Sequence, residues 1–241
     1  METAHTKATA EPNTLQGSAA MVCGVLVLFS FAIGAAMGAY PGGTHLDPTQ
    51  AGYDFWNNFW CDALRNPALN GEPNVRGARM ASIALWVLSA GLLPFWGMAA
   101  ELSVPRVEAA SAARTAIRWL GTCAMLGMMG VTVLPSDQYP FVHGLLVSVA
   151  GPLGILAAAL AVIKGHSSRR VPGIASLLGG LSLFSALSNL LQYARQFWLA
   201  AAPWPFLPAL QKVATLFFLS WVVTLSAAAL SGREFPRRRP I

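Results

Sequence analysis

The stretch that decides the fold is residues 18–40, SAAMVCGVLVLFSFAIGAAMGAY, which contains no Asp, Glu, Lys or Arg. A helix needs about 20 mainly apolar residues to cross the hydrocarbon core of a bilayer. This segment is long enough to do so, and it is longer than the apolar region of a secretory signal peptide. We therefore expect a retained transmembrane helix near the N-terminus.

Five more segments of the same kind follow along the chain. We expect them to span the membrane at residues 80–100, 119–135, 144–163, 171–194 and 213–232. The segment at 119–135 is short, and we expect it to begin before Arg118, whose long side chain can reach the interface. Only 11% of the residues are charged, whereas about 25% is usual for a soluble domain. The sequence thus predicts an all-α, polytopic membrane bundle of six transmembrane helices.

The predicted spans leave no room for a second domain of ordinary size. We expect residues 1–16 to form a disordered cytoplasmic tail, residues 17–232 the membrane domain and residues 233–241 a basic cytoplasmic tail. Within the membrane domain, residues 41–79 connect the first two helices. Connections of this length are commonly functional or disordered, and we expect this one to cap the bundle on its outer side.

Basic residues are distributed unequally between the two ends of the predicted bundle. With six spans both termini lie on the same side, and eleven of the 16 Lys and Arg residues fall there. Because cytoplasmic loops are enriched in Lys and Arg, both termini are predicted to be cytoplasmic. The net charge of +6 then belongs to the cytoplasmic face, and we expect no nucleic-acid partner. We expect the protein in the plasma membrane, which in a prokaryote is the cytoplasmic membrane.

The outer loop is rich in aromatic residues. Residues 53–64 read YDFWNNFWCDAL, a segment too apolar to stay solvated. At helical spacing, Phe55, Trp56 and Phe59 would share one face. We therefore expect residues 52–64 to form a short amphipathic helix that lies along the outer interface.

Polar side chains collect at the same end of the bundle. The topology brings together a set that we predict to bind a ligand, namely Asp54, Trp56, Asn58, Trp60, Asp62, Asp137, His143, Asn189, Gln211 and Lys212. A polar pocket under aromatic residues can hold a lipid headgroup or a small solute. The structural alternative is that the loop carboxylates pair with nearby basic residues while the aromatic residues form an interfacial belt.

Three members of this set are candidates for catalysis. Asp62, Asp137 and His143 carry groups suited to general acid and base chemistry, or to metal ligation by oxygen and nitrogen. They form no recognised spacing motif, so we assign no metal site, and the sequence identifies no cofactor. Lys212 has two interpretations: a lysine that reaches the interface from a helix end, or the counter-charge of an outer carboxylate.

Several short motifs resemble those of a known family. They are Tyr40-Pro41-Gly42-Gly43, Asn58-Phe59-Trp60-Cys61-Asp62, Gly71-Glu72-Pro73-Asn74, Pro135-Ser136-Asp137 and His143-Gly144. On these residues the chain resembles the multi-pass membrane proteins of the domain of unknown function 998, and more distantly the Frag/DRAM/Sfk-like six-span proteins. The resemblance implies six helices and a polar site that faces outward, but no established reaction. Cys61-Asp62-Ala63 departs from the Ser-Asp-Leu-Gly form of that group.

Three functional hypotheses follow. The first is an integral membrane protein that binds a lipid, a small ligand or a partner through an outer-leaflet site. The second is an outer-leaflet membrane enzyme, for example a metal-assisted hydrolase. The third is an accessory subunit of a larger membrane complex, to which small residues on the helix faces are suited. The expected partners are therefore membrane lipids and another membrane protein subunit.

Overall fold

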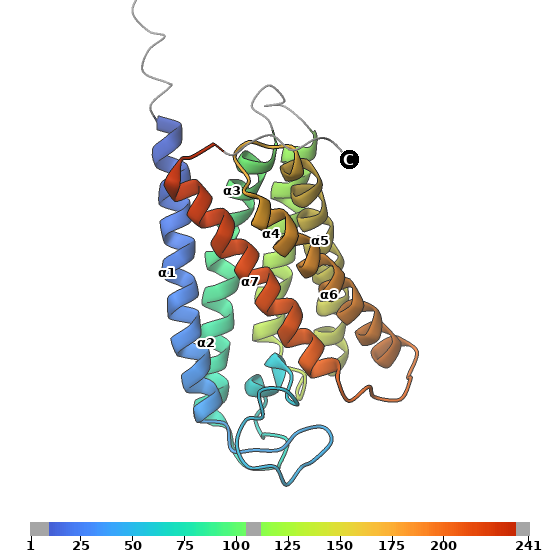
Figure 1. Cartoon of the computed structure of the whole chain (residues 1–241). Helices are drawn as coiled ribbons and strands as arrows, with labels where there is room; N and C mark the ends of the chain where they lie inside the picture. The colour runs from blue at the N-terminus through green and yellow to red at the C-terminus, as the bar shows by residue number, and fades with distance from the viewer. Residues whose placement is uncertain (1–9, 105–111, 235–241) are drawn as a thin grey trace, which may run out of the picture.

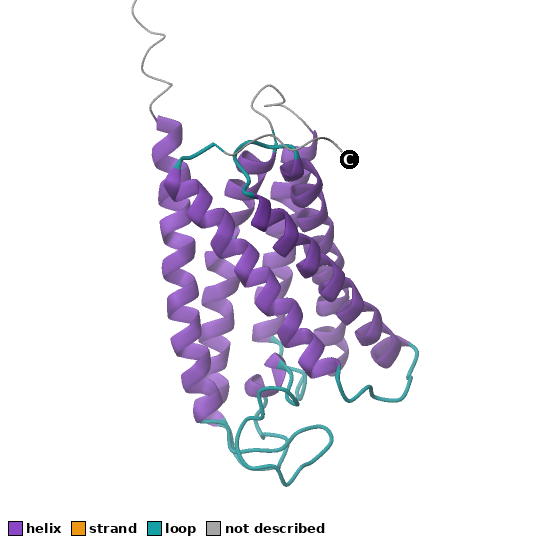
Figure 2. Cartoon of the chain, in the orientation of Figure 1, coloured by secondary structure: helices purple, strands orange, loops and turns teal. Residues whose placement is uncertain are grey.

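The computed structural model of the chain describes residues 10–104 and 112–234. The α-helices are α1 (Ala10–Gly38), α2 (Val75–Gly91), α3 (Leu93–Ser103), α4 (Ala112–Val133), α5 (Pro140–His166), α6 (Gly173–Trp198) and α7 (Leu207–Ser231), and a 3₁₀-helix, η1 (Trp60–Leu64), lies between α1 and α2. Because α2 and α3 together form one span, six segments are long and apolar enough to cross a membrane. The prediction of an all-α bundle of six transmembrane helices is confirmed (Figures 1 and 2).

Helices that follow each other in the chain also pack against each other. α1 packs against α2, α4 against α5, and α6 against α7, and α1 also contacts α7. The start of α1 and the end of α7 lie at one end of the bundle, and the connection between α1 and α2 lies at the opposite end (Figure 1). We call these the inner and the outer end. An even number of spans requires this arrangement.

The first helix is longer than the sequence predicted. It begins at Ala10, so residues 10–16, which we expected in a tail, continue the helix. Residues 1–9, the remainder of that predicted tail, lie outside the described residues. So do residues 235–241, which make up most of the predicted basic tail.

The second span is divided between an outer helix, α2, and an inner helix, α3. Pro94 is the second residue of α3. Proline has no backbone N–H, and its ring clashes with the carbonyl of the preceding turn, so a continuous helix cannot pass through it without distortion. In α5, by contrast, the helix continues through Pro152, as neighbouring helices allow in a membrane bundle.

An aromatic cluster packs the middle of the bundle, where α3 meets α7. The rings of Phe95 and Trp221 lie 5.4 Å apart in an edge-to-face arrangement, and Trp96 and Phe218 complete the cluster. Trp96 fits because Gly121 of α4 has no side chain. A Cβ at Gly121 would lie 2.1 Å from the indole ring of Trp96. Any larger residue at this position would therefore displace the indole.

The outer loop is folded, but it is not the amphipathic helix that we expected over residues 52–64. The carboxylate of Asp54 accepts the backbone N–H groups of Trp56 at 2.9 Å and Asn57 at 3.1 Å. Aspartate forms such turns in competition with helical hydrogen bonding. A turn therefore occupies the first part of the segment, and only Trp60–Leu64 is helical, as the short η1.

Candidate functional site

The outer loop is attached to the first turns of α7 by three hydrogen bonds. The backbone N–H of Trp60 donates to Gln211 Oε1 at 3.0 Å, and its indole Nε1 donates to Thr215 Oγ1 at 3.1 Å. Lys212 Nζ donates to the carbonyl oxygen of Asn58 at 2.5 Å. Gln211 and Thr215 are four residues apart and therefore lie on the same face of α7. This face receives Trp60, so η1 is held against the helix.

Lys212 is completely buried beneath the loop, with 0% of its surface exposed. Its Nζ lies 4.6 Å from the ring centre of Trp60, 5.5 Å from that of Phe55 and 5.6 Å from that of Tyr53. A cation is attracted to aromatic ring faces, and the attraction is stronger when both are desolvated. Lys212 therefore does not extend to the solvent. It acts as the cationic centre around which the aromatic residues of the loop pack.

Asp62 is a buried hydrogen-bond acceptor inside the outer loop. It is 2% exposed, and its Oδ2 accepts the backbone N–H of Phe59 at 2.7 Å and the amide of Asn58 at 3.4 Å. Its Oδ1 lies 3.0 Å from Nε2 of His45, whose side chain is half exposed. Asp62 also attracts Lys212 electrostatically. Buried charges are stable only when they are paired and hydrogen-bonded, and Asp62 meets this condition.

Asn58 links the same network to the start of the loop. Its side-chain Nδ2 donates to the carbonyl oxygen of Gly43 at 2.8 Å, and its Oδ1 accepts the backbone N–H of Asp54 at 2.9 Å. Asn58 is fully buried. Since both ends of its amide are occupied by the protein, its role here is to hold two parts of the loop together.

Several titratable groups of the loop have shifted pKa values. Burial raises the pKa of the Cys61 thiol to about 12 and also raises that of the Tyr53 phenol. The pKa of Asp54 is lowered, chiefly because its carboxylate accepts a hydrogen bond from the side chain of Asn57. At neutral pH the loop therefore carries a neutral thiol, a neutral phenol and an ionised Asp54.

The three candidates for catalysis, Asp62, Asp137 and His143, each form hydrogen bonds with different partners. Asp137 Oδ2 accepts the backbone N–H of Asn66 at 3.2 Å, and His143 Nδ1 lies 2.8 Å from the carbonyl oxygen of Leu134. The charges of Asp62 and Asp137 act on His143 electrostatically, but no hydrogen bond joins the three side chains. Within residues 10–104 and 112–234, no three His, Cys, Asp or Glu side chains are placed to hold a metal ion. A catalytic role of the three residues stays a prediction.

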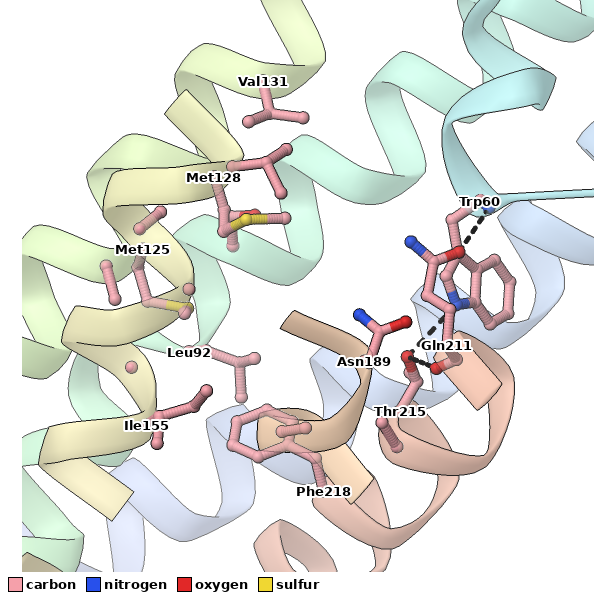
Figure 3. Close-up of a pocket in the computed structure, with 18 of the residues that line it drawn as sticks. Trp60, Leu92, Met125, Met128, Val131, Ile155, Asn189, Gln211, Thr215 and Phe218 are labelled. Atoms are coloured by element: carbon pink, nitrogen blue, oxygen red, sulfur yellow. Dashed lines mark hydrogen bonds between the residues drawn. The ribbon is translucent and has the colours of Figure 1, made fainter. Parts of the chain in front are cut away.

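A cavity of about 310 Å³ lies inside the bundle beneath η1 (Figure 3). Trp60 and Cys61 line it from the loop, and every span contributes to its walls. Most of the lining is apolar, with side chains that include Leu92, Met125, Met128, Ile155 and Phe218. None of the described residues that line it is charged.

Two side-chain amides face the cavity near its outer end. Asn189 lies in the outer half of α6 and Gln211 in the second turn of α7. Gln211 Oε1 is occupied by Trp60, but its Nε2 has no hydrogen-bond partner among the described residues, and neither has the amide of Asn189. In Figure 3 both amide nitrogens point toward the side of the cavity where Met125 and Met128 lie. Both residues are only partly buried, so their free amide groups are accessible from the cavity and can bind a polar atom there, of a ligand or of water.

The predicted binding set is thus divided by the fold. Trp60, Asn189 and Gln211 line the cavity, while Asp54, Asn58, Asp62 and Lys212 hold the loop. Trp56 is 50% exposed on the surface. Asp137 and His143 make the separate contacts given above.

Sequence reasoning did not identify several residues of the cavity. Thr215 lies four residues after Gln211, so helical spacing was a usable signal for it. The apolar wall residues, such as Leu92, Met128 and Phe218, carry no such signal. In a membrane span, an apolar side chain that faces a cavity cannot be distinguished by hydropathy from one that faces lipid.

Comparison with known proteins gives no match to a family, to a curated protein or to a solved structure. The class of the protein therefore follows from its fold. Six apolar helices of membrane length define an integral, multi-pass membrane protein.

Proposed function

We propose that this integral membrane protein binds a small, membrane-soluble molecule in the cavity beneath η1. The observation that carries the proposal is that free hydrogen-bonding groups of two amides, that of Asn189 and Nε2 of Gln211, face a mostly apolar cavity. Ligand sites typically combine apolar walls with a few placed polar groups in this way. The outer loop would then be the cover of the site, since Trp60 and Cys61 form part of its lining.

The size of the cavity supports occupation. Its volume of about 310 Å³ is at the lower limit of the range of about 300–1,000 Å³ that is typical of small-molecule sites. Protein interiors are close-packed and contain few voids larger than a water molecule. The cavity is partly open, so a molecule can enter it, and one that fills it buries apolar surface, which is favourable.

A matched pair of glycine substitutions tests the proposal. Gly154 lines the cavity, and a Cβ there would make an ordinary contact of 3.5 Å with Ala124, whereas Gly180 faces open space outside the bundle. Gly154→Leu should fill the cavity, and Gly180→Leu should leave it unchanged. Because both variants replace a helical glycine by leucine, they change helix propensity equally.

The measurement is photolabelling of the full chain in nanodiscs with a 12-carbon alcohol that carries a diazirine. Labelled positions are then mapped by peptide mass spectrometry. We expect labelling at Met125, Met128 or Ile155, which line the cavity, in the wild-type protein and in Gly180→Leu. We expect its loss in Gly154→Leu. Absence of cavity labelling in the wild-type protein, or equal labelling in both variants, would refute the proposal.

We also propose that the inner end of the bundle is cytoplasmic and that the protein lies in the plasma membrane, as the distribution of Lys and Arg predicts. Two exposed positions provide a test. Leu46 lies in the outer loop, and Ser167 follows α5 at the inner end. In a background without the native cysteines, a membrane-impermeant maleimide added to intact cells should modify Leu46→Cys. It should modify Ser167→Cys only after permeabilisation, and the reverse pattern would show the opposite orientation.

A further inference from the structure

We propose that the ligand is a neutral amphiphile with a single chain or a single ring, whose polar end carries a carbonyl or hydroxyl oxygen held by Asn189 and Gln211. This inference rests on the proposed function, because it names the chemical class of molecule that the same cavity takes. It is carried by the chemistry of the two amides, by the absence of charge in the described lining, and by the volume of the cavity and the arrangement of its lining.

The lining favours a neutral ligand. The nearest charged residues in the sequence are neighbours of lining residues: Lys212 follows Gln211, and Asp62 follows Cys61. Neither lines the cavity, since Lys212 is bonded to Asn58 and Asp62 to the backbone of Phe59. An ionised headgroup in the cavity would therefore find no counter-charge among the residues that line it, and burying such a group is far more costly than burying a hydrogen-bonded neutral group.

The hydrogen-bonding capacity of the amides specifies an oxygen on the ligand. Gln211 Oε1 already accepts the N–H of Trp60, so its free group is Nε2, which can only donate. The ligand must therefore present an acceptor at this point. Asn189 has both a donor and an acceptor available. A carbonyl oxygen satisfies the donors, and a hydroxyl group also satisfies the acceptor.

The positions of the polar and apolar lining residues fix the orientation of the amphiphile. Asn189 and Gln211 lie near the outer end of the bundle, beside η1, whereas Leu92, Ile155 and Phe218 line the cavity away from the loop (Figure 3). The polar end of the ligand would thus lie beneath Trp60, with its apolar part directed toward the middle of the membrane. A volume of about 310 Å³ suits one short chain or ring system better than the two full acyl chains of a lipid. Methionine side chains in the wall can adapt to an irregular apolar shape.

Three probes of equal chain length test the inference in the wild-type protein. They are the diazirine-bearing 12-carbon alcohol, the corresponding carboxylate at pH 8 and the corresponding hydrocarbon. We expect the alcohol to label the cavity about three- to tenfold more strongly than the hydrocarbon, the range that one or two net hydrogen bonds provide. We expect the carboxylate to label it least. Labelling by the carboxylate that equals labelling by the alcohol would overturn the inference.

A matched pair of amide substitutions on α6 adds a second test. Asn189 has no protein partner among the described residues, so Asn189→Leu removes only a group directed at the ligand. Gln192 accepts a hydrogen bond from Arg195 at 2.9 Å and does not line the cavity, so Gln192→Leu is the control. Asn189→Leu should abolish the preference for the alcohol over the hydrocarbon, and Gln192→Leu should retain it. Retention of the preference in Asn189→Leu would contradict the inference.

The two proposals fail in different ways. If no probe labels the cavity of the wild-type protein, the proposed function fails and the inference fails with it. If all three probes label the cavity alike, the proposed function holds and only the chemical class of the ligand is wrong. Should Asn189→Leu not fold, the comparison of the three probes on the wild-type protein decides the inference without it.

Discussion

Lys212 and Asn58 are 154 positions apart in the sequence, yet the ammonium group of the lysine lies 2.5 Å from the carbonyl oxygen of the asparagine. This contact joins the last span to the outer loop in a buried, aromatic environment. The lysine therefore has a structural role that its position near a helix end did not reveal. The stability of the loop is expected to depend on it.

Replacing Lys212 by methionine should release the loop. Lys212→Met keeps an unbranched side chain, one atom shorter, but leaves the carbonyl of Asn58 without its donor, and an unsatisfied buried polar group costs about 1–3 kcal/mol. We expect faster proteolysis within residues 41–74 and a lower Tm in detergent. Arg79→Met is the control, since Arg79 is exposed. Equal protease resistance of the two variants would show that Lys212 does not hold the loop.

The indole of Trp60 should be energetically coupled to Thr215. Trp60→Phe and Thr215→Val each remove one partner of the 3.1 Å hydrogen bond, and each should destabilise the protein by about 0.5–1.5 kcal/mol. Because both residues belong to one interaction, the double variant should lose less stability than the sum of the losses in the two single variants. The free energy of unfolding in a denaturant titration in micelles measures this. Strict additivity would mean that the bond contributes nothing.

The turn at Asp54 should weaken in acid. Hydrogen bonds from Asn57 and the backbone lower the pKa of Asp54 below its ordinary value of 3.8. Its contribution to stability is therefore fully present above that ordinary value and is lost as the pH falls through the lower pKa of the folded protein. We expect hydrogen exchange at Trp56 and Asn57, corrected for intrinsic rates, to accelerate below about pH 4.

Asp54→Asn provides the control for this pH dependence, because asparagine retains the acceptor and does not titrate. Exchange at Trp56 and Asn57 should then lose its acid dependence. The pKa of Asp47 is lowered independently, chiefly by its hydrogen bond with Thr49, so exchange at Thr49 should keep its acid dependence in the same sample. If Trp56 and Asn57 respond to acid alike in both proteins, Asp54 is not the titrating group.

The thiol of Cys61 should be poorly reactive. With a pKa of about 12, the thiolate fraction at pH 9 is on the order of one in a thousand, whereas a free cysteine with a pKa of about 8.5 is mostly ionised. In a Cys23→Ser, Cys123→Ser background, alkylation by iodoacetamide at pH 9 should be about 100-fold slower in the folded protein than in the denatured chain. Equal rates would show that the pKa of the Cys61 thiol is not raised in the folded protein.

The outer loop shows where local sequence patterns fail. Residues 52–64 have the spacing of an amphipathic helix, but Asp54 closes a turn with Trp56 and Asn57 and so prevents the helix from starting there. The aromatic side chains of this segment are instead arranged around Lys212. Aspartate is a known competitor of helical hydrogen bonding, but the partner on α7 could not be deduced from the segment itself.

The sequence by itself determined the class of the protein, the number of spans and the end of the bundle at which the loop and the polar residues gather. These properties follow from the length and apolar character of each segment, because the bilayer imposes the same requirement on every helix. Only the tertiary structure decided that Asn189 and Gln211 face a common cavity and that Asp62 and Lys212 do not. That division depends on how the helices are rotated and packed against one another. In an apolar transmembrane helix, the hydropathy of the residues does not show which face is turned inward.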